Sequence, residues 1–339
     1  MSNILIEKFP LRTVFRVRQL PFLARFYRFA YYGQNSNRAG FWLTRILSRI
    51  FRIYRRFCGP SVGEFDYERL GQRATIRFDA RNLQYQALYA PYFKNGYEPE
   101  VGALLDLLLP EAGTFLDIGS NWGYFTLHAV SKHSRLTVHA FEPMPATYQD
   151  LISCVTQAGL SSLVTCHNLA LSSADGEAFI QIPDGLHSGL AEVSHSGGAT
   201  RIATRRLDSL GLPKPDFIKM DVEGHEIEVL NGAKETLKAS RPFIIFESKP
   251  DHLCPEKTLE VLFFLAALGY HFYVPTVQRQ LDGRNYHMQC SGFPIGGEDK
   301  LALVPLEAGT RLLWQHDVNV FACHESRLQE LMTVFESFP

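Results

Sequence analysis

The chain has 339 residues, of which 46% are hydrophobic and 20% are charged, as is typical of folded globular proteins. The formal net charge of −1 hides a split, because residues 1–59 carry 12 Lys/Arg and one acid, and the remainder has a net charge of −12. Six scattered cysteines without a C-x-x-C pair argue against a zinc site and a secreted disulfide framework. No apolar run suggests a signal peptide or a membrane-spanning helix, so we expect a cytoplasmic protein.

The basic segment at the start of the chain predicts an amphipathic helix with one cationic face. Arg45, Arg49, Arg52 and Arg56 recur at the spacing of a single helical stripe, beside a stripe of apolar and aromatic residues. Three interpretations remain open: the segment packs on the acidic body or on a second subunit of a homodimer, it binds an anionic membrane surface through residues 1–59, or it binds nucleic acid. Nucleic acid is disfavoured because the acidic remainder of the chain would repel phosphate.

From about residue 70 the pattern changes to alternating strands and helices. The predicted strands are 114–118, 136–142, 163–168, 216–221, 242–247, 270–274 and 318–324, with a strand or hairpin at 74–89. The predicted helices are 98–113, one from about 122, 145–158, 224–239 and 256–268. This alternation predicts an α/β, Rossmann-like fold with a mostly parallel, doubly wound sheet of seven strands. The predicted domains are a basic helical extension over 1–62 and a second domain over 63–339, with its core at about 95–325.

The stretch FLDIGSNWGYF, residues 115–125, places an acid at the end of a predicted buried strand. Asp117 is followed by Gly119 and Gly123, so the spacing is D-x-G-x-x-x-G and not the G-x-G-x-x-G of a dinucleotide-binding turn. In an open α/β sheet, ligands bind at the carboxyl ends of the strands, where glycines let the backbone approach them. A carboxylate at this turn favours a cofactor with a cationic ammonium group over a pyrophosphate.

Two further polar residues end the next predicted strands. The carboxylate of Glu142 can accept both hydroxyls of a ribose, although this acid alone would also suit NAD, and Asn168 could face an adenine edge. Together with the glycine turn they predict S-adenosylmethionine as the cofactor; the alternative is a structural turn with surface acids. The predicted cofactor-binding residues are Asp117, Gly119, Ser120, Asn121, Gly123, Glu142, Pro143, Asn168 and Asp221.

The block KMDVEGHEIEVL, residues 219–230, is predicted to close the other side of the same cleft. Asp221 ends a predicted buried strand, where it could position the methyl donor, orient a substrate hydroxyl, or bind a divalent cation such as Mg²⁺ with Glu247. His225 is the first candidate for a general base because histidine titrates near neutral pH; His252 and His187 are weaker candidates. The predicted catalytic residues are His225, Asp221 and Glu223, and the candidate metal ligands are Asp221 and Glu247.

Several blocks of the sequence resemble, in the same order, the FkbM family of S-adenosylmethionine-dependent methyltransferases. They are FLDIGSNWGYFTL, FEP (141–143), NLALSSADGEAFI (168–180), TRRLDSL (204–210) and DFIKMDVEGHEIEVLNGAKETL (216–237), followed by RPFIIFE (241–247). The resemblance covers about residues 95–325, and IKMDVEGHE is its most specific part. It implies a class I methyltransferase fold and O-methylation, often of sugars in surface glycans, glycolipids or natural products.

We therefore expect an S-adenosylmethionine-dependent O-methyltransferase that acts on a sugar hydroxyl of a glycan, a glycolipid or a lipid-linked intermediate. If the basic segment binds a membrane surface, we expect a peripheral protein on the inner face of the cell membrane. Two alternatives remain, a soluble O-methyltransferase for small natural products and a catalytically silent methyltransferase-like binding module. The Gly- and Ser-rich stretch 184–198 is a candidate substrate loop.

Overall fold

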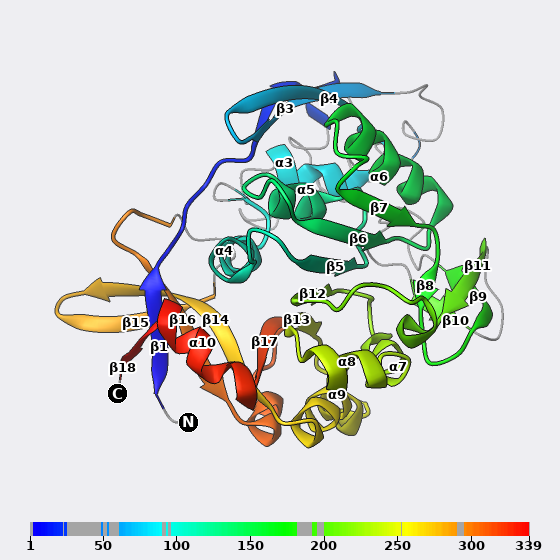
Figure 1. Cartoon of the computed structure of the whole chain (residues 1–339). Helices are drawn as coiled ribbons and strands as arrows, with labels where there is room; N and C mark the ends of the chain where they lie inside the picture. The colour runs from blue at the N-terminus through cyan, green and yellow to red at the C-terminus, as the bar shows by residue number, and fades with distance from the viewer. Residues whose placement is uncertain are drawn as a thin grey trace.

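The computed structural model describes residues 3–22, 24–25, 49, 53, 61–89, 93, 96–181, 192–194, 200–251, 253–289 and 295–338. Its central sheet has eleven strands (Figure 1). They are β1 (Ile4–Lys8), β5 (Thr114–Ile118), β6 (Thr137–Phe141), β7 (Val164–His167), β12 (Phe217–Met220), β13 (Phe243–Ser248), β14 (Tyr270–Leu281), β15 (Arg284–Met288), β16 (Lys300–Leu306), β17 (Val318–His324) and β18 (Glu336–Phe338). The order is β18-β1-β16-β14-β17-β13-β12-β5-β6-β7, and β15 pairs with β14.

Seven of these strands form the predicted doubly wound sheet. β7, β6, β5, β12 and β13 are parallel neighbours, and β17 lies antiparallel between β13 and β14. Every residue of β5 and β12 is buried, because helices cover both faces of the sheet. The predicted α/β, Rossmann-like fold is thus confirmed, and β16, β1, β18 and β15 widen the sheet by antiparallel pairing.

The helices divide between the two faces, each with its own hydrophobic cluster (Figure 1). One face is covered by α4 (Pro99–Leu108), α5 (Tyr124–Val130) and α6 (Pro145–Gln157), and the other by α7 (Glu226–Asn231), α8 (Lys234–Ser240) and α9 (Pro255–Ala267). The helix predicted over 224–239 is therefore two helices. Gly232 lies between them, so close to Ser172 that a Cβ would meet the Ser172 carbonyl oxygen at 2.0 Å.

The first described residues form strands, so the prediction of a helical extension over 1–62 is wrong for this part. β1 pairs with β16 and β18 in the central sheet. A second sheet contains β2 (Phe15–Gln19), β3 (Val62–Arg69) and β4 (Gln72–Asp79). In β2 the sequence FRVRQ alternates half-buried apolar residues with exposed arginines, which suits a strand with one solvent face. The arginine stripe over 45–56 lies outside the described residues except for Arg49.

A third sheet follows β7 and stands beside the carboxyl end of the central sheet (Figure 1). It contains β8 (Ala170–Leu171), β9 (Gly176–Gln181), β10 (Glu192–Ser194) and β11 (Thr200–Arg205). The candidate substrate loop 184–198 lies outside the described residues apart from β10. Among the described residues, no helix combines the length and the apolar character that a bilayer crossing requires.

Candidate functional site

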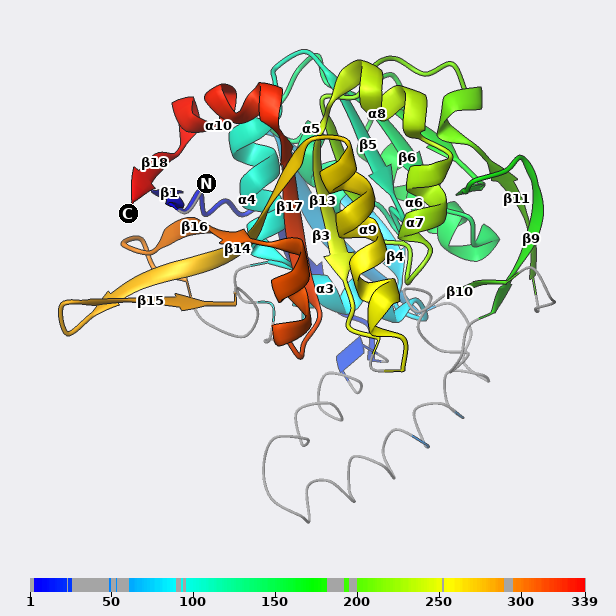
Figure 2. The same ribbon diagram turned by 90° about the horizontal axis from the view of Figure 1, so that it is seen from below.

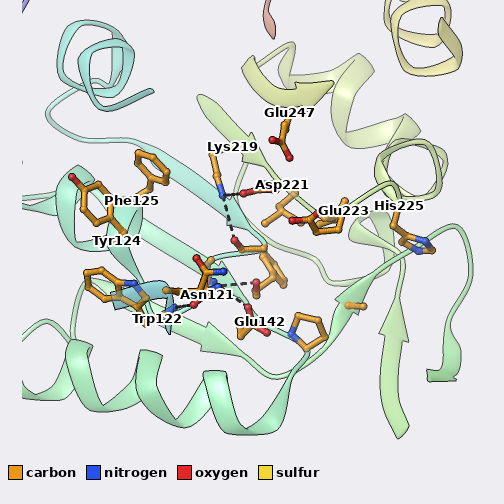
Figure 3. Close-up of a pocket in the computed structure, with 18 of the residues that line it drawn as sticks. Asn121, Trp122, Tyr124, Phe125, Glu142, Lys219, Asp221, Glu223, His225 and Glu247 are labelled. Atoms are coloured by element: carbon orange, nitrogen blue, oxygen red, sulfur yellow. Dashed lines mark hydrogen bonds and ion pairs between the residues drawn. The ribbon is translucent and has the colours of Figure 1, made fainter. Parts of the chain in front are cut away.

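A cavity of about 320 Å³ opens at the carboxyl ends of β5, β6, β12 and β13. This volume lies within the range of about 300–1,000 Å³ of small-molecule sites, and its position is where open α/β sheets bind ligands. Figure 3 shows Glu142 on one side of the cavity and Lys219, Asp221 and Glu247 on the other. The two blocks singled out in the sequence therefore do face each other across one cleft.

The glycine turn forms part of the cavity wall and is locked against the opposite block. Gly119 has φ +78°, and a Cβ on it would meet the carbonyl oxygen of Asp221 at 1.8 Å, so only glycine fits here. The amides of Gly119 and Ser120 both donate to the carbonyl oxygen of Phe141 at 3.0 Å. Gly123, with φ +97°, does not line the cavity; it begins α5 and lies against Leu151.

Glu142 is a buried carboxylate held by two backbone amides. Its Oε2 accepts from the amide of Asn121 at 3.0 Å, and its Oε1 accepts from the amide of Met144 at 2.8 Å. Each oxygen keeps a further lone pair for a ligand hydroxyl. Burial raises the pKa of Glu142 to about 7, and the two amide donors oppose this rise. This arrangement fits the predicted contact with a ribose.

Asn168 does not face the cavity. Its Nδ2 donates to the carbonyl oxygens of Glu142 and Pro143, at 2.9 and 3.1 Å, and its side chain is exposed. The lining is instead formed by the next residues, Leu169, Ala170 and Leu171. The region predicted for the adenine is therefore present, but its surface is apolar and Asn168 supports it from behind.

Asp117 also lies behind the cavity wall. Its side chain is fully buried, accepts from Thr126 Oγ1 at 2.6 Å and is 3.9 Å from Lys219 Nζ. Burial raises the pKa of Asp117, and Lys219 opposes the rise. A direct contact between Asp117 and the cofactor ammonium is thus not what the geometry shows. The carboxylate holds Lys219, which does line the cavity.

Lys219 is the site residue that sequence reasoning missed. Its Nζ is 3.3 Å from both Asp221 Oδ2 and the Gly119 carbonyl oxygen, and 5.3 Å from the centre of the Phe125 ring. Burial lowers its pKa, but the carboxylates of Asp221 and Asp117 raise it by more, so the pKa is above its ordinary value. The available signal was a lysine inside the apolar strand DFIKMD, since lysine is almost never fully buried unless it is paired.

A cluster of carboxylates occupies the other end of the cavity. Oxygen atoms of Asp221, Glu223 and Glu247 all lie within 4.8 Å of one another. Lys249 pairs with Glu223 and lies 3.3 Å from Glu247 Oε2. Burial and then the charge of Asp221 raise the pKa of both glutamates to about 7. The two candidate metal ligands are therefore close together, but a lysine ammonium already contacts the cluster.

His225 lines the cavity beyond Glu223, on the side away from Lys219 and Asp221 (Figure 3). Its Nε2 is 3.0 Å from Ser172 Oγ, and the residue directly precedes α7. Glu226 begins α7 and accepts from the amide of Gly224 at 3.3 Å, so its role is structural. The weaker candidates His252 and His187 lie outside the described residues.

Comparison with known families agrees with this geometry. Residues 117–272 match the methyltransferase FkbM domain, and the match contains the glycine turn, Glu142 and the whole carboxylate cluster. We call this matched stretch, residues 117–272, the FkbM domain below. The FkbM domain therefore supplies the main cavity walls, while β1 and β2 come from outside it.

Two relatives that match this region are methyltransferases by name. The hexuronic acid methyltransferase AglP of Haloferax volcanii is 35% identical over 151 residues, which are 42% of this chain and 60% of that protein. Methyltransferase 1 of Beauveria bassiana is 28% identical over 149 residues, which are 36% of this chain and 59% of that protein. The chain thus spans about 60% of the length of these curated relatives. A solved methyltransferase FkbM from Methylobacillus flagellatus is 15% identical, with a TM-score of 0.38 over 63% of this chain and 45% of that one.

Proposed function

We propose that this chain is an S-adenosylmethionine-dependent O-methyltransferase whose acceptor is a hydroxyl of a sugar in a glycan, a glycolipid or a lipid-linked intermediate. The observation that carries the proposal is the cavity, with Glu142 on one side and the Lys219–Asp221 pair on the other. The FkbM domain supports methyl transfer, and the name of the relative AglP, a hexuronic acid methyltransferase, supports a sugar acceptor.

The residues of the cavity fit S-adenosylmethionine by their chemistry. Glu142 would accept hydrogen bonds from the ribose hydroxyls, and Leu169, Ala170 and Leu171 offer an apolar wall for the adenine. Asp221 would face the positively charged part of the cofactor, and the buried Lys219, 3.3 Å from Asp221 Oδ2, would hold its carboxylate in place. When bound, the cofactor supplies an electrophilic methyl group on a sulfonium sulfur.

The carboxylate cluster would accept the proton of the acceptor hydroxyl. A general base works best when its pKa lies near the operating pH, and Glu223 and Glu247 both have a pKa of about 7. Asp221 would orient the hydroxyl between them. His225 would act as a positioning residue for the turn after β12, because its ring is held by Ser172.

Acceptor assays with the purified full-length protein test this assignment. Production of S-adenosylhomocysteine is measured with neutral sugars, uronic acid glycosides and lipid-linked sugars. Glu223→Gln and Glu247→Gln are each expected to lower kcat by about 10²-fold or more, the contribution of a general base, and His225→Asn by about tenfold or less. A larger loss of kcat in His225→Asn than in either glutamine variant would indicate that His225 is the general base. Cofactor binding without turnover on every acceptor would favour a silent binding module.

We infer further that the protein works at an anionic membrane surface. The net positive charge of residues 1–59 supports this, as do two exposed leucines that lie close in the chain to a cavity residue. Leu312 and Leu313 are 43% and 79% exposed, four to five residues before the cavity residue Asp317. Arg311 is buried and donates to the Ser248 carbonyl oxygen, directly before the cavity residue Lys249. This contact ties the segment that carries the two leucines to the end of β13.

Flotation with vesicles that contain anionic lipid tests the membrane inference. The paired variant Leu312→Asp, Leu313→Asp is expected to lose most of its vesicle binding, because it replaces exposed apolar surface with charge that anionic lipid repels. Leu281→Asp is the matched control, since Leu281 is 50% exposed on the distal β14–β15 hairpin (Figure 2). Equal flotation of both variants and the unchanged protein would contradict the inference. Truncation before residue 60 is unsuitable as a test, because it removes β1 and β2.

A further inference from the structure

Lys249 stands inside the carboxylate cluster, where a divalent cation would otherwise be expected. Its Nζ contacts the carboxylates of Glu223 and Glu247, and the oxygens of these two residues and of Asp221 lie within 4.8 Å of one another. Hard divalent cations bind at points where several carboxylate oxygens converge. In this chain the positive charge at that point comes from the protein itself.

The sequence explains why the ammonium reaches this position. Glu247 lies in β13, and Lys249 directly follows the last residue of that strand, with its Nζ 3.3 Å from Glu247 Oε2. Glu223 comes from the turn after β12 and has φ +56°, a left-handed conformation that is uncommon for a residue with a side chain. The pairing with Lys249 gives this turn a fixed partner at the end of the neighbouring strand β13.

We propose that Lys249 is the resident cation of the carboxylate cluster, that it positions Glu223 and Glu247 for the acceptor hydroxyl, and that the site works without a divalent ion. The Nζ of Lys249 contacts the carboxylates of both Glu223 and Glu247, so its ammonium is paired on both sides. The positioning of Glu223 and Glu247 for the acceptor rests on the proposed function. The occupation of the cluster by Lys249 is independent of that function.

Lys249 takes no part in the bond changes of the methyl transfer. The acceptor oxygen forms a bond to the methyl carbon, and the bond between that carbon and the sulfonium sulfur breaks. The electron pair of the broken bond goes to sulfur, which becomes a neutral thioether. The hydroxyl proton passes to a carboxylate of the cluster. Lys249 gains and loses no proton, and it is a positioning residue because it acts through Glu223 and Glu247.

Binding of Mn²⁺ to the full-length protein tests the occupation of the cluster without any acceptor or cofactor. Free Mn²⁺ is measured by electron paramagnetic resonance. The unchanged protein and Lys249→Arg are expected to bind Mn²⁺ at least tenfold more weakly than Lys249→Ala, in which Glu223 and Glu247 are left without their ammonium. Adding Glu247→Gln to Lys249→Ala is expected to abolish the gain. Lys249→Gln serves as the second uncharged variant, with folding of every variant checked by circular dichroism.

Two outcomes would overturn the proposal. The first is tight Mn²⁺ binding by the unchanged protein, together with loss of this binding in Glu247→Gln. The cluster would then be a metal site, and Lys249 would move away when the metal binds. The second is no gain in either uncharged variant, since Lys249 would then not be holding a cation position. Failure of the proposed function would instead appear as the absence of turnover on every acceptor, with the Mn²⁺ results unchanged.

Activity measurements separate a positioning role from general destabilisation. Turnover of the unchanged protein is expected to be insensitive to EDTA. Lys249→Ala is expected to lose at least tenfold in kcat with little change in cofactor affinity, and Lys249→Arg to recover part of that loss. Activity that EDTA abolishes and Mg²⁺ restores in the unchanged protein would contradict the proposal.

Discussion

Replacing Lys219 with methionine is expected to destabilise the protein by about 3–5 kcal/mol, because removal of one partner from a buried ion pair leaves an uncompensated charge. Lys219 Nζ lies 3.9 Å from Asp117 and 3.3 Å from Asp221. Asp117 is fully buried and has no access to water as a substitute partner. The same variant is expected to lose cofactor binding, since Lys219 lines the cavity and holds the Gly119 carbonyl oxygen.

Urea unfolding and calorimetry with S-adenosylhomocysteine measure the two effects. Lys238→Met is the control, because Lys238 forms an exposed pair with Glu235 that contributes at most about 1 kcal/mol. Combining Lys219→Met with Asp117→Asn is expected to restore part of the lost stability, since the buried negative charge is removed together with its partner. If Lys219→Met unfolds at the same urea concentration as Lys238→Met, the buried ion pair does not hold this cleft together.

The position of the site was largely predictable from the sequence, whereas its internal pairing was not. Gly119, Glu142 and Asp221 lie at strand ends that the hydrophobic pattern located, and strand ends gather at one edge of a parallel sheet. Lys219 and Asp117 are directly opposite each other on β12 and β5 although 102 residues separate them along the chain. The pairing register of β12 and β5 is set by the tertiary structure and cannot be seen in the sequence. Without it, Asp117 was predicted to bind the cofactor and not to pair with Lys219.

The role of the first twenty residues could not be read from composition either. β1 pairs with β16 and β18, which lie about 300 residues further along the chain. A local sequence pattern therefore cannot predict this pairing. Phe15 of β2 packs on Trp122 with ring centroids 5.9 Å apart, which supports the glycine turn from behind. Arginine-rich composition suggested a detached extension, but these residues are part of the structure that shapes the cavity.

Replacing Glu142 with alanine is expected to weaken the binding of an adenosine-type ligand by about 10²-fold or more. Two hydroxyl groups donating to a buried carboxylate form hydrogen bonds of about 1.5–3 kcal/mol each, and both are lost. The loop is also released, because the amides of Asn121 and Met144 lose their acceptor. Calorimetry with 5′-methylthioadenosine measures this contribution alone, since that ligand has the ribose and the adenine but no amino-acid part.

The pH dependence of the same binding gives the sharper test. Burial raises the pKa of Glu142 to about 7 in the free protein, and ribose hydroxyls donate much more strongly to the carboxylate than to the protonated acid. Ligand binding therefore favours the deprotonated form, so affinity is expected to rise with pH up to about 7 and to level off above it. The fall between pH 8 and pH 5 is expected to approach about a hundredfold, the limit for one linked proton.

Two variants show whether this proton belongs to Glu142. Glu142→Gln removes the titrating group and is expected to bind weakly with no dependence on pH over this range. Asp150→Asn is the matched control, because Asp150 is another partly buried acid, with a pKa raised to about 6 by burial, and Asn82 holds it outside the cavity. Asp150→Asn is expected to keep both the affinity and the pH profile of the unchanged protein. A pH profile that persists in Glu142→Gln would show that the linked proton belongs to a group other than Glu142.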